Sequence, residues 1–253
     1  MEKKKTIQSI DKAAKILNFI AKSGNEARLT EISNELDIKK STLSGLLSTL
    51  EYNELVYQNP ETLRYSLGIK LYEYGKIYEE NFSLKNIVRP YLEKLSKEFG
   101  EGVYLAIESD YHVLYVDRIE ANHSLRLATK PGHTDPMYCN AMGKVILAFQ
   151  SQDYFDNYLN NSERVKLTET TLTTKEELTN EIKQIRELGY ALDNEEIEKG
   201  LICVAAPIFG ENNSLVAVIA VSGPINRIDS KILNKLKITI PEIAAQISNI
   251  IKY

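Results

Sequence analysis

The sequence predicts an α+β protein with a mainly helical N-terminal region and a larger C-terminal region built on an antiparallel sheet. Before Gly100 the apolar residues recur mainly at helical spacing, whereas beyond it short β-rich runs alternate with helical segments. The chain has 253 residues, of which 43% are apolar, and this is enough to bury a core in each of two domains. We therefore expect two domains connected by a helix.

The N-terminal region begins with two predicted helices. In IQSIDKAAKILNFIA, residues 7–21, the apolar side chains lie on one helical face, and Ser9 is a candidate N-cap. In LTEISNELDI, residues 29–38, the apolar residues again have helical spacing, and Thr30 can provide the cap.

The segment DIKKSTLSGLLSTLE, residues 37–51, predicts a third helix with two different faces. Its leucines recur at i, i+3, i+4 and i+7, so one stripe is buried. The other face carries two lysines, several hydroxyl side chains and Gly45, and no acid follows Asp37 until Glu51. A core helix does not need such a face, whereas a helix that meets phosphate does. A tight turn at residues 37–39 joins the two helices and indicates a helix-turn-helix.

A hairpin and a further helix follow. The runs LVYQ and LRYSL surround an NPET turn, and a hairpin in this position makes the region a winged helix-turn-helix. Residues 67–82, LGIKLYEYGKIYEENF, have apolar and aromatic residues in a helical pattern and predict a linker helix. The expected domains are the winged helix-turn-helix at 1–67, the linker helix at 68–82 and a second domain at 83–253.

The second domain is predicted to hold a mainly antiparallel sheet. The expected strands lie in VYLAIES, HVLYVDRI, LRLAT, GLICVAAPIF and SLVAVIAVSG. The expected helices lie in LKNIVRPYLEKLSKEF, NAMGKVILAF, TKEELTNEIKQIRELG and about residues 229–251. HTDP at 133–136 is expected to be a loop, in which His133 and Asp135 are turn residues rather than a catalytic dyad.

Composition and motifs exclude several classes of protein. The longest apolar run, LVAVIAV, is far too short to span a membrane, and the N-terminus lacks the apolar stretch of a secretory signal. We therefore expect a cytoplasmic protein without membrane contact. The two cysteines and three histidines lack the spacing of a metal site, and glycine-rich nucleotide motifs are absent, so we expect no metal and no cofactor. A nucleophile at Cys203 or Ser222 would need a positioned histidine base. No histidine has a fixed relation to either, so we expect no catalytic residue and no enzyme.

Charge favours the N-terminal region as the part that contacts DNA. Residues 1–75 hold nine Lys, two Arg and ten acids, a net charge of +1, while the rest of the chain carries -5. Lysines and helix-start amides hold phosphates, whereas short polar side chains in the first half of a helix read base edges. The candidate DNA-binding residues are Lys39, Lys40, Ser41, Thr42, Ser44, Gly45, Thr49, Arg64 and Tyr65. The alternative for this helix alone is a solvated face with ordinary surface serines.

One winged domain binds DNA weakly, so a palindromic double-stranded operator bound by two copies is expected. Leu71, Tyr74 and Tyr78 of the linker helix would supply the contact between copies. The alternative is that this face packs on its own chain.

Seven motifs in order resemble the IclR family of bacterial transcriptional regulators. They are SIDKAAKIL, LTEISNELDIKKSTLSGLLSTLEYNELV, YSLGIKLYEYG, LYVDRIEANHSLRL, NAMGKVILA, IRELGYALDNEEIEKGLICVAAPI and VAVIAVSGPINRI, and they cover nearly the whole chain. The resemblance implies a GAF-like effector-binding domain after the winged helix-turn-helix, repression of transcription, and dimers or tetramers. The family commonly has an arginine in the middle of the recognition helix, where this chain reads STLSGLLSTL.

The resemblance also implies an effector pocket in the second domain. YCNAMGK opens a helix whose amides can bind a carboxylate, so the expected effector is a small organic or sugar acid. The candidate effector-binding residues are Asn140, Ala141, Met142, Asp193, Cys203 and Ser222. Each polar member has an alternative role: Cys203 in a core, Ser222 in a turn and Asp193 as a cap of the segment after it. Arg118 and Arg126 are expected to be exposed strand charges.

A second hypothesis belongs to another class of protein. In it, the C-terminal region is a small-molecule sensor or an enzyme, and residues 1–75 form a helical module that binds protein. DNA binding in a gel shift separates the two hypotheses.

Overall fold

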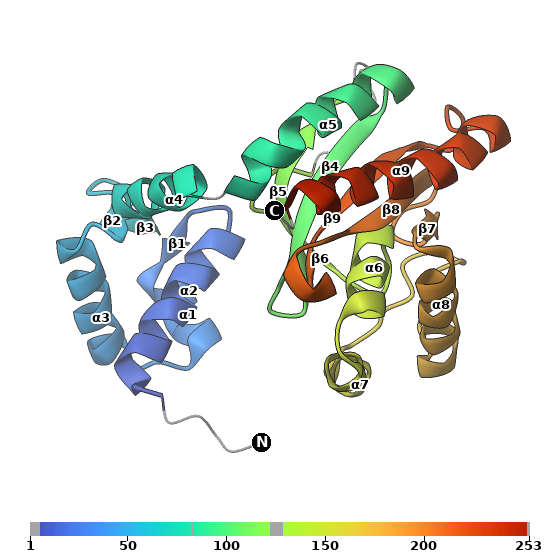
Figure 1. Cartoon of the computed structure of the whole chain (residues 1–253). Coiled ribbons are helices and arrows are strands. Elements are labelled where there is room, and N and C mark those ends of the chain that lie inside the picture. Colours follow the sequence, from blue (N-terminus) through green and yellow to red (C-terminus); the bar gives the residue numbers. More distant parts are fainter. Residues whose placement is uncertain (1–5, 82, 122–128, 252–253) are drawn as a thin grey trace. The chain divides into compact units, whose positions relative to one another are not determined.

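The computed structural model describes residues 6–81, 83–121 and 129–251 of the chain, which divides into two compact units, Met1–Phe82 and Ser83–Tyr253 (Figure 1). Arg126, which was expected to be an exposed strand charge, and most of the predicted strand LRLAT lie outside the described residues. Each unit has its own core and is treated separately below.

The N-terminal unit is a bundle of short helices against a small sheet. Its elements are α1 (Gln8–Lys22), β1 (Ala27–Arg28), α2 (Leu29–Leu36), α3 (Lys40–Tyr52), β2 (Val56–Gln58), β3 (Arg64–Leu67) and α4 (Ile69–Asn81). The strands are antiparallel in the order β1-β3-β2, so the predicted hairpin is present and gains a third strand. Its core includes Ile16 and Ile20 of α1, Ile32 of α2, and Leu43 and Leu47 of α3.

The turn between α2 and α3 is fixed by local contacts. Asp37 has the left-handed backbone conformation with φ of 48°, which aspartate tolerates better than most residues. The Ser33 hydroxyl donates to the Ile38 carbonyl at 2.8 Å, and the Ile38 side chain is buried. The turn is therefore tied to the core, and this sets the direction in which α3 leaves it.

Both predicted N-caps in this unit were wrong. The helix N-caps are Ile7 for α1 and Arg28 for α2, each two residues before the predicted Ser9 and Thr30. At α2, Glu31 in the first turn accepts a hydrogen bond from the Arg28 amide at 2.7 Å. A carboxylate in the first turn satisfies a free helix amide as a capping hydroxyl would, so the hydroxyls of Ser9 and Thr30 are not required.

The C-terminal unit is built on one sheet of strands in the order β6-β5-β4-β9-β8-β7, all antiparallel. The strands are β4 (Gly102–Ser109), β5 (His112–Ile119), β6 (Thr134–Pro136), β7 (Ala191–Asn194), β8 (Leu201–Phe209) and β9 (Leu215–Pro224). The helices are α5 (Ser83–Phe99), α6 (Ala141–Phe149), α7 (Gln152–Asn161), α8 (Lys175–Leu188) and α9 (Ser230–Ile251), with a 3₁₀ turn η1 (Glu211–Asn213) between β8 and β9. The expectation of an α+β fold with an antiparallel sheet is confirmed.

Helices cover both faces of this sheet (Figure 1). On one face α5 and α9 pack on side chains such as Val103 of β4 and Val204 of β8. On the other face α6, α7 and α8 pack on side chains such as Tyr104 and Ala205, the next residues along. Strand alternation thus divides each strand between two cores.

Some elements were not expected from the sequence. Residues 133–136 were predicted to be a loop, but Thr134–Pro136 forms β6, which pairs with the first residues of β5 at the sheet edge. Proline removes a hydrogen-bond donor and is tolerated at such an edge. Strand β7 and helix α7 were also missed. No helix in the described ranges is long and apolar enough to cross a membrane.

Candidate DNA-binding face and ligand pocket

Helix α3 presents a polar face to solvent. Leu43, Leu47 and Leu50 point into the core of the unit, as their helical spacing requires. The exposed residues of this face are Lys39, Lys40, Ser41, Thr42, Ser44, Gly45, Ser48 and Thr49. The first turn holds no acid, so its cations and free amide hydrogens together make the helix start electropositive.

Gly45 lies in the middle of this face. A side chain at Gly45 would meet no atom within 4 Å, so the glycine is not required for packing inside the chain. The Thr49 hydroxyl donates to the Gly45 carbonyl at 2.8 Å and is held against the helix. Because Gly45 has no side chain, it leaves a shallow depression in the helix surface.

The wing contributes less to this face than expected. Arg64 is partly exposed, and its guanidinium lies 3.8 Å from the Glu31 carboxylate. Tyr65 was predicted to contact DNA, but its side chain is buried in the core of the N-terminal unit, so this prediction was wrong. Neighbouring residues of a strand point to opposite faces of the sheet, so Tyr65 points away from the face that carries Arg64. The burial of Tyr65 is further favoured because β3 is the central strand of its sheet. The exposed residues of the hairpin are Tyr57 of β2 and residues 60–63 of the turn.

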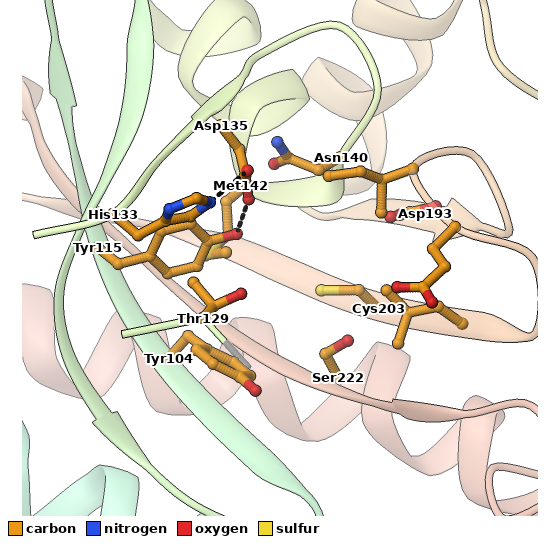
Figure 2. A pocket seen from close by; sticks show the side chains of 13 residues that line it. Tyr104, Tyr115, Thr129, His133, Asp135, Asn140, Met142, Asp193, Cys203 and Ser222 are labelled. Carbon is orange, nitrogen blue, oxygen red and sulfur yellow. Dashed lines mark hydrogen bonds and ion pairs between the residues drawn. The ribbon is translucent and has the colours of Figure 1, made fainter. Parts of the chain in front are cut away.

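The C-terminal unit contains a pocket of about 410 Å³ between the sheet and the start of α6 (Figure 2). Five of the six predicted effector-binding residues line it: Asn140, Met142, Asp193, Cys203 and Ser222. The sixth, Ala141, does not, because its side chain is buried in the core under α6. The structure also adds Tyr104, Tyr115, Thr129, His133, Asp135, Ile197, Glu198 and Leu201 to the lining.

Strand register brings three of these side chains together. Asp193 of β7 is directly opposite Cys203 of β8, and Cys203 is opposite Ser222 of β9. Ser222 is in turn opposite Gly102 of β4. Directly opposed residues point to the same face, so Asp193, Cys203 and Ser222 form a row across three strands. Ser222 is therefore a strand residue, and the alternative that it forms a turn is not observed.

The start of α6 closes the other side of the pocket. Asn140 is the N-cap: its side-chain oxygen accepts from the Gly143 amide at 2.7 Å, and its Nδ2 donates to the Pro136 carbonyl at 2.6 Å. Any side chain at Gly143 would collide with the Met137 backbone, so glycine allows the helix to lie close to that segment. The amides of Ala141 and Met142 remain without an intrahelical acceptor.

Asp193 is both a cap and a pocket residue. Its Oδ1 accepts from the Glu196 amide at 2.7 Å, as the alternative reading expected, and its carboxyl also lines the pocket. The pKa of Asp193 is raised to about 7, mainly by burial and in part by the charge of Glu196, while the hydrogen bond from the Glu196 amide and the charge of Lys144 oppose the rise. The group is thus divided between acid and carboxylate near neutral pH.

A hydrogen-bonded group faces this row across the pocket (Figure 2). The Tyr115 hydroxyl donates to Asp135 at 2.8 Å, and His133 Nε2 lies 3.0 Å from the other oxygen of Asp135. Burial raises the pKa of Tyr115, and it raises that of Tyr104 to about 12, so both phenols are neutral. Reasoning from the sequence missed this group because residues 133–136 were predicted to be a loop. The alternation of Val113 and Tyr115 on β5 would have indicated that Tyr115 faces the same core as α6.

The thiols are unsuited to nucleophilic attack. Burial raises the pKa of Cys203, and it raises that of Cys139 to about 12. A protonated thiol is a poor nucleophile. Within the described ranges no three His, Cys, Asp or Glu side chains are grouped as a metal site would require.

Arg118 was expected to be an exposed strand charge, and this prediction was wrong. Its guanidinium is mostly buried and bonds the Thr129 carbonyl and the Glu120 carboxylate. Arg118 thereby holds Thr129, which lines the pocket.

Comparison with known proteins agrees with both units. Residues 9–60 match the IclR helix-turn-helix domain, and residues 77–249 match the C-terminal domain of bacterial IclR transcriptional regulators. The chain is 30% identical to the HTH-type transcriptional regulator XynR of Escherichia coli K12 over 98% of both chains. It is 32% identical to the transcriptional repressor IclR of the same organism over 88% of this chain and 82% of that one.

A solved structure gives the same result. The crystal structure of Thermotoga maritima IclR has a TM-score of 0.71 and 31% identity, covering 98% of this chain and all of that one. Both of these Escherichia coli relatives are named as regulators of transcription. The chain belongs to the IclR family of bacterial transcriptional regulators.

Proposed function

We propose that this DNA-binding regulator is a repressor and that two or four copies of the chain bind a palindromic operator. A small organic or sugar acid then releases the repressor from the operator or repositions it. In this proposal residues 1–67 bind DNA, residues 68–82 link the domains, and residues 83–253 bind the effector. The observation that carries it is the exposed, acid-free face of α3 on a helix-turn-helix. The repressor activity of a relative, stated in its name, supports the direction of regulation.

On DNA, α3 enters the major groove by its first half. Lys39 and Lys40 contact phosphates, together with the helix-start amides near Ser41. Thr42, Ser44 and Gly45 approach base edges, where Gly45 lets the helix come close. Thr49 follows the groove, and Arg64 of the wing contacts the backbone.

Helix α4 supplies the contact between copies. It exposes Ile69, Tyr72, Tyr74, Ile77 and Tyr78, each with more than half of its surface accessible in a single chain. Exposed aromatic and aliphatic residues gathered on one helix are typical of a surface that another protein covers. A second copy in this position would set the spacing between two recognition helices.

The effector binds in the pocket with its carboxylate at the start of α6. The amides of Ala141 and Met142 supply hydrogen bonds and the favourable end of the helix dipole. Asn140, Asp193, Cys203 and Ser222 supply further polar contacts to the effector from the pocket lining. For the effector to act, the DNA-bound arrangement of the paired chains and the released or repositioned arrangement must bind it with different affinity. A ligand with equal affinity for both would not change the equilibrium between them.

A gel shift on DNA from upstream of the protein's own gene tests the DNA assignment. The Lys39→Glu, Lys40→Glu double variant should lose binding at about 0.15 M salt and show a shallower salt dependence, because each phosphate contact releases counterions. Wild-type affinity in that variant would exclude α3 as the DNA-binding helix. Ser222→Ala is the matched control for the pocket: it should keep operator affinity and weaken the response to the effector.

A further inference from the structure

The pocket carries an unusual balance of charge for a site that takes an acid. Its described lining includes three carboxyl groups, those of Asp135, Asp193 and Glu198, and neither lysine nor arginine. A ligand carboxylate at the start of α6 would lie beside Asp193, because Asn140, the N-cap of α6, and Asp193 lie next to each other in the pocket (Figure 2). Two carboxylates at such a distance repel one another unless one of them holds a proton.

Among the described residues that line the pocket, none is a lysine or arginine that could relieve this repulsion. The charge of the buried Lys144 of α6 acts on Asp193, but its Nζ lies 2.8 Å from Glu181, 2.6 Å from Glu196 and 2.7 Å from the Leu192 carbonyl. An ammonium group has three donors, and these three acceptors use them all. Lys144 therefore neutralises its own partners and has no hydrogen left for a ligand.

We propose, within the function proposed above, that Asp193 binds the effector's carboxylate as a neutral carboxylic acid, donating its proton in an O–H···O⁻ hydrogen bond. No covalent bond forms or breaks, and the proton remains between the two groups. A hydrogen bond of this kind is among the strong ones, since one partner is charged. Effector binding then requires one proton on Asp193 and weakens as the solution becomes alkaline.

The groups around Asp193 support a proton at this position. Its side chain is 1% exposed, and its pKa is already near neutral before any ligand is bound. Five titratable side chains face it from the packed elements: Lys144 from α6, Cys139 before α6, Glu196 after β7, Cys203 from β8, and Glu181 of α8 through Lys144. Asp135 and His133 lie across the pocket. Bringing in a carboxylate raises the pKa of Asp193 further, so the proton is kept or taken up on binding.

The expected size of the effect follows from linkage. With a pKa of about 7 in the free protein and a higher one in the complex, affinity for an acid falls about tenfold between pH 6 and pH 8. A neutral ligand in the same pocket has no such dependence.

The test uses full-length protein with acetate and D-gluconate as acids and D-sorbitol as the neutral counterpart of gluconate. Binding is measured by calorimetry at about pH 6 and about pH 8, in buffers of different ionisation enthalpy. We expect both acids to weaken about tenfold and to take up close to one proton per site at the higher pH. Asp193→Asn, which keeps a hydrogen-bond donor without a charge, should bind the acids with a flat pH profile.

His133→Gln is the matched control, because histidine ordinarily titrates in the same pH range. The pH dependence should survive in that variant. Infrared difference spectra of the wild type provide a reading that does not depend on a variant folding: a protonated carboxyl band should persist in the complex at about pH 8.

Each other outcome is decisive. Equal affinity for the acids at both pH values, or a pH dependence retained in Asp193→Asn, overturns the inference and leaves the proposed regulator intact. Failure of both acids to bind at the lower pH overturns it together with the carboxylate class of effector. Operator binding in the gel shift is a separate measurement and reports on the regulator itself.

Discussion

The Nζ atom of Lys144 lies 2.6 Å from Oε1 of Glu196, and the lysine side chain is fully buried. The same ammonium holds Glu181 of α8 and the Leu192 carbonyl of β7. One buried cation thus joins α6, α8 and the segment after β7 at the back of the pocket. This contact fixes the position of the α6 start relative to Asp193.

Replacing this cation should be costly. Lys144→Met leaves Glu196 buried without its partner, and loss of one member of a buried ion pair costs about 3–5 kcal/mol of unfolding free energy. Urea unfolding of the two proteins measures it. Lys235→Met is the control, since its pair with Glu98 is more exposed and should contribute at most about 1 kcal/mol. A similar, small loss in both variants would show that the buried network does not stabilise the domain.

Asp193 should make stability depend on pH. Its pKa is raised from 3.8 to about 7, so the folded chain keeps this proton where the unfolded chain has released it. Its contribution is complete below about pH 4 and is lost as pH rises toward 7, by at most about 1.4 kcal/mol per pH unit. The free energy of unfolding of Asp193→Asn, measured with urea, should therefore rise relative to that of the wild type as the pH increases over that range.

The control for this prediction is Glu198→Gln, since Glu198 is an exposed acid at the same pocket. It should follow the wild type across the pH range. A constant difference between Asp193→Asn and wild type at all pH values would mean that Asp193 does not titrate as proposed.

Gly45→Ala should separate stability from DNA binding. Alanine in place of an exposed helical glycine adds about 0.5–1 kcal/mol of stability, and here the new methyl meets no other atom of the chain. The methyl lies where a base edge would approach, so we expect operator affinity to fall about tenfold, which is 1.4 kcal/mol. Ser48→Ala on the same helix is the control and should leave operator affinity unchanged. An unaltered gel shift for Gly45→Ala would remove Gly45 from the DNA-binding face.

The aromatic face of α4 should be needed for assembly. Tyr72→Ser with Tyr74→Ser removes two rings that are more than half exposed in a single chain. Sedimentation should then show the monomer at concentrations where the wild type is a dimer or tetramer. Tyr52→Ser, at the end of α3, removes an exposed ring outside α4 and should leave the mass of the oligomer unchanged. Unchanged assembly in the double variant would place the contact elsewhere.

The sequence predicts most helices and strands of this chain, because the leucine spacing in α3 and the short apolar runs of β4 and β9 are patterns that the geometry of helices and buried strands requires. The pocket is legible only in part. Asp193, Cys203 and Ser222 were named from the resemblance, but their row depends on the register of three strands, which is set by long-range pairing.

The errors have physical reasons too. Tyr65 was taken for a surface residue because a four-residue strand is too short for its alternation to show which face is buried. Lys144 was passed over in a helix of otherwise apolar character, since its acidic partners lie 37 and 52 residues further along the chain. No local pattern connects residues so far apart.

The alternation of β8 bears on how the pocket can change in evolution. Cys203 faces the pocket, while Ile202 and Val204 on either side pack against the layer of α5 and α9. A substitution at 203 therefore alters what the pocket accepts and leaves the opposite layer in place. Insertion of one residue would exchange the two sets of side chains and put a thiol among the aliphatic groups. Related regulators should accordingly differ in ligand by point replacements along these strands, with strand length held constant.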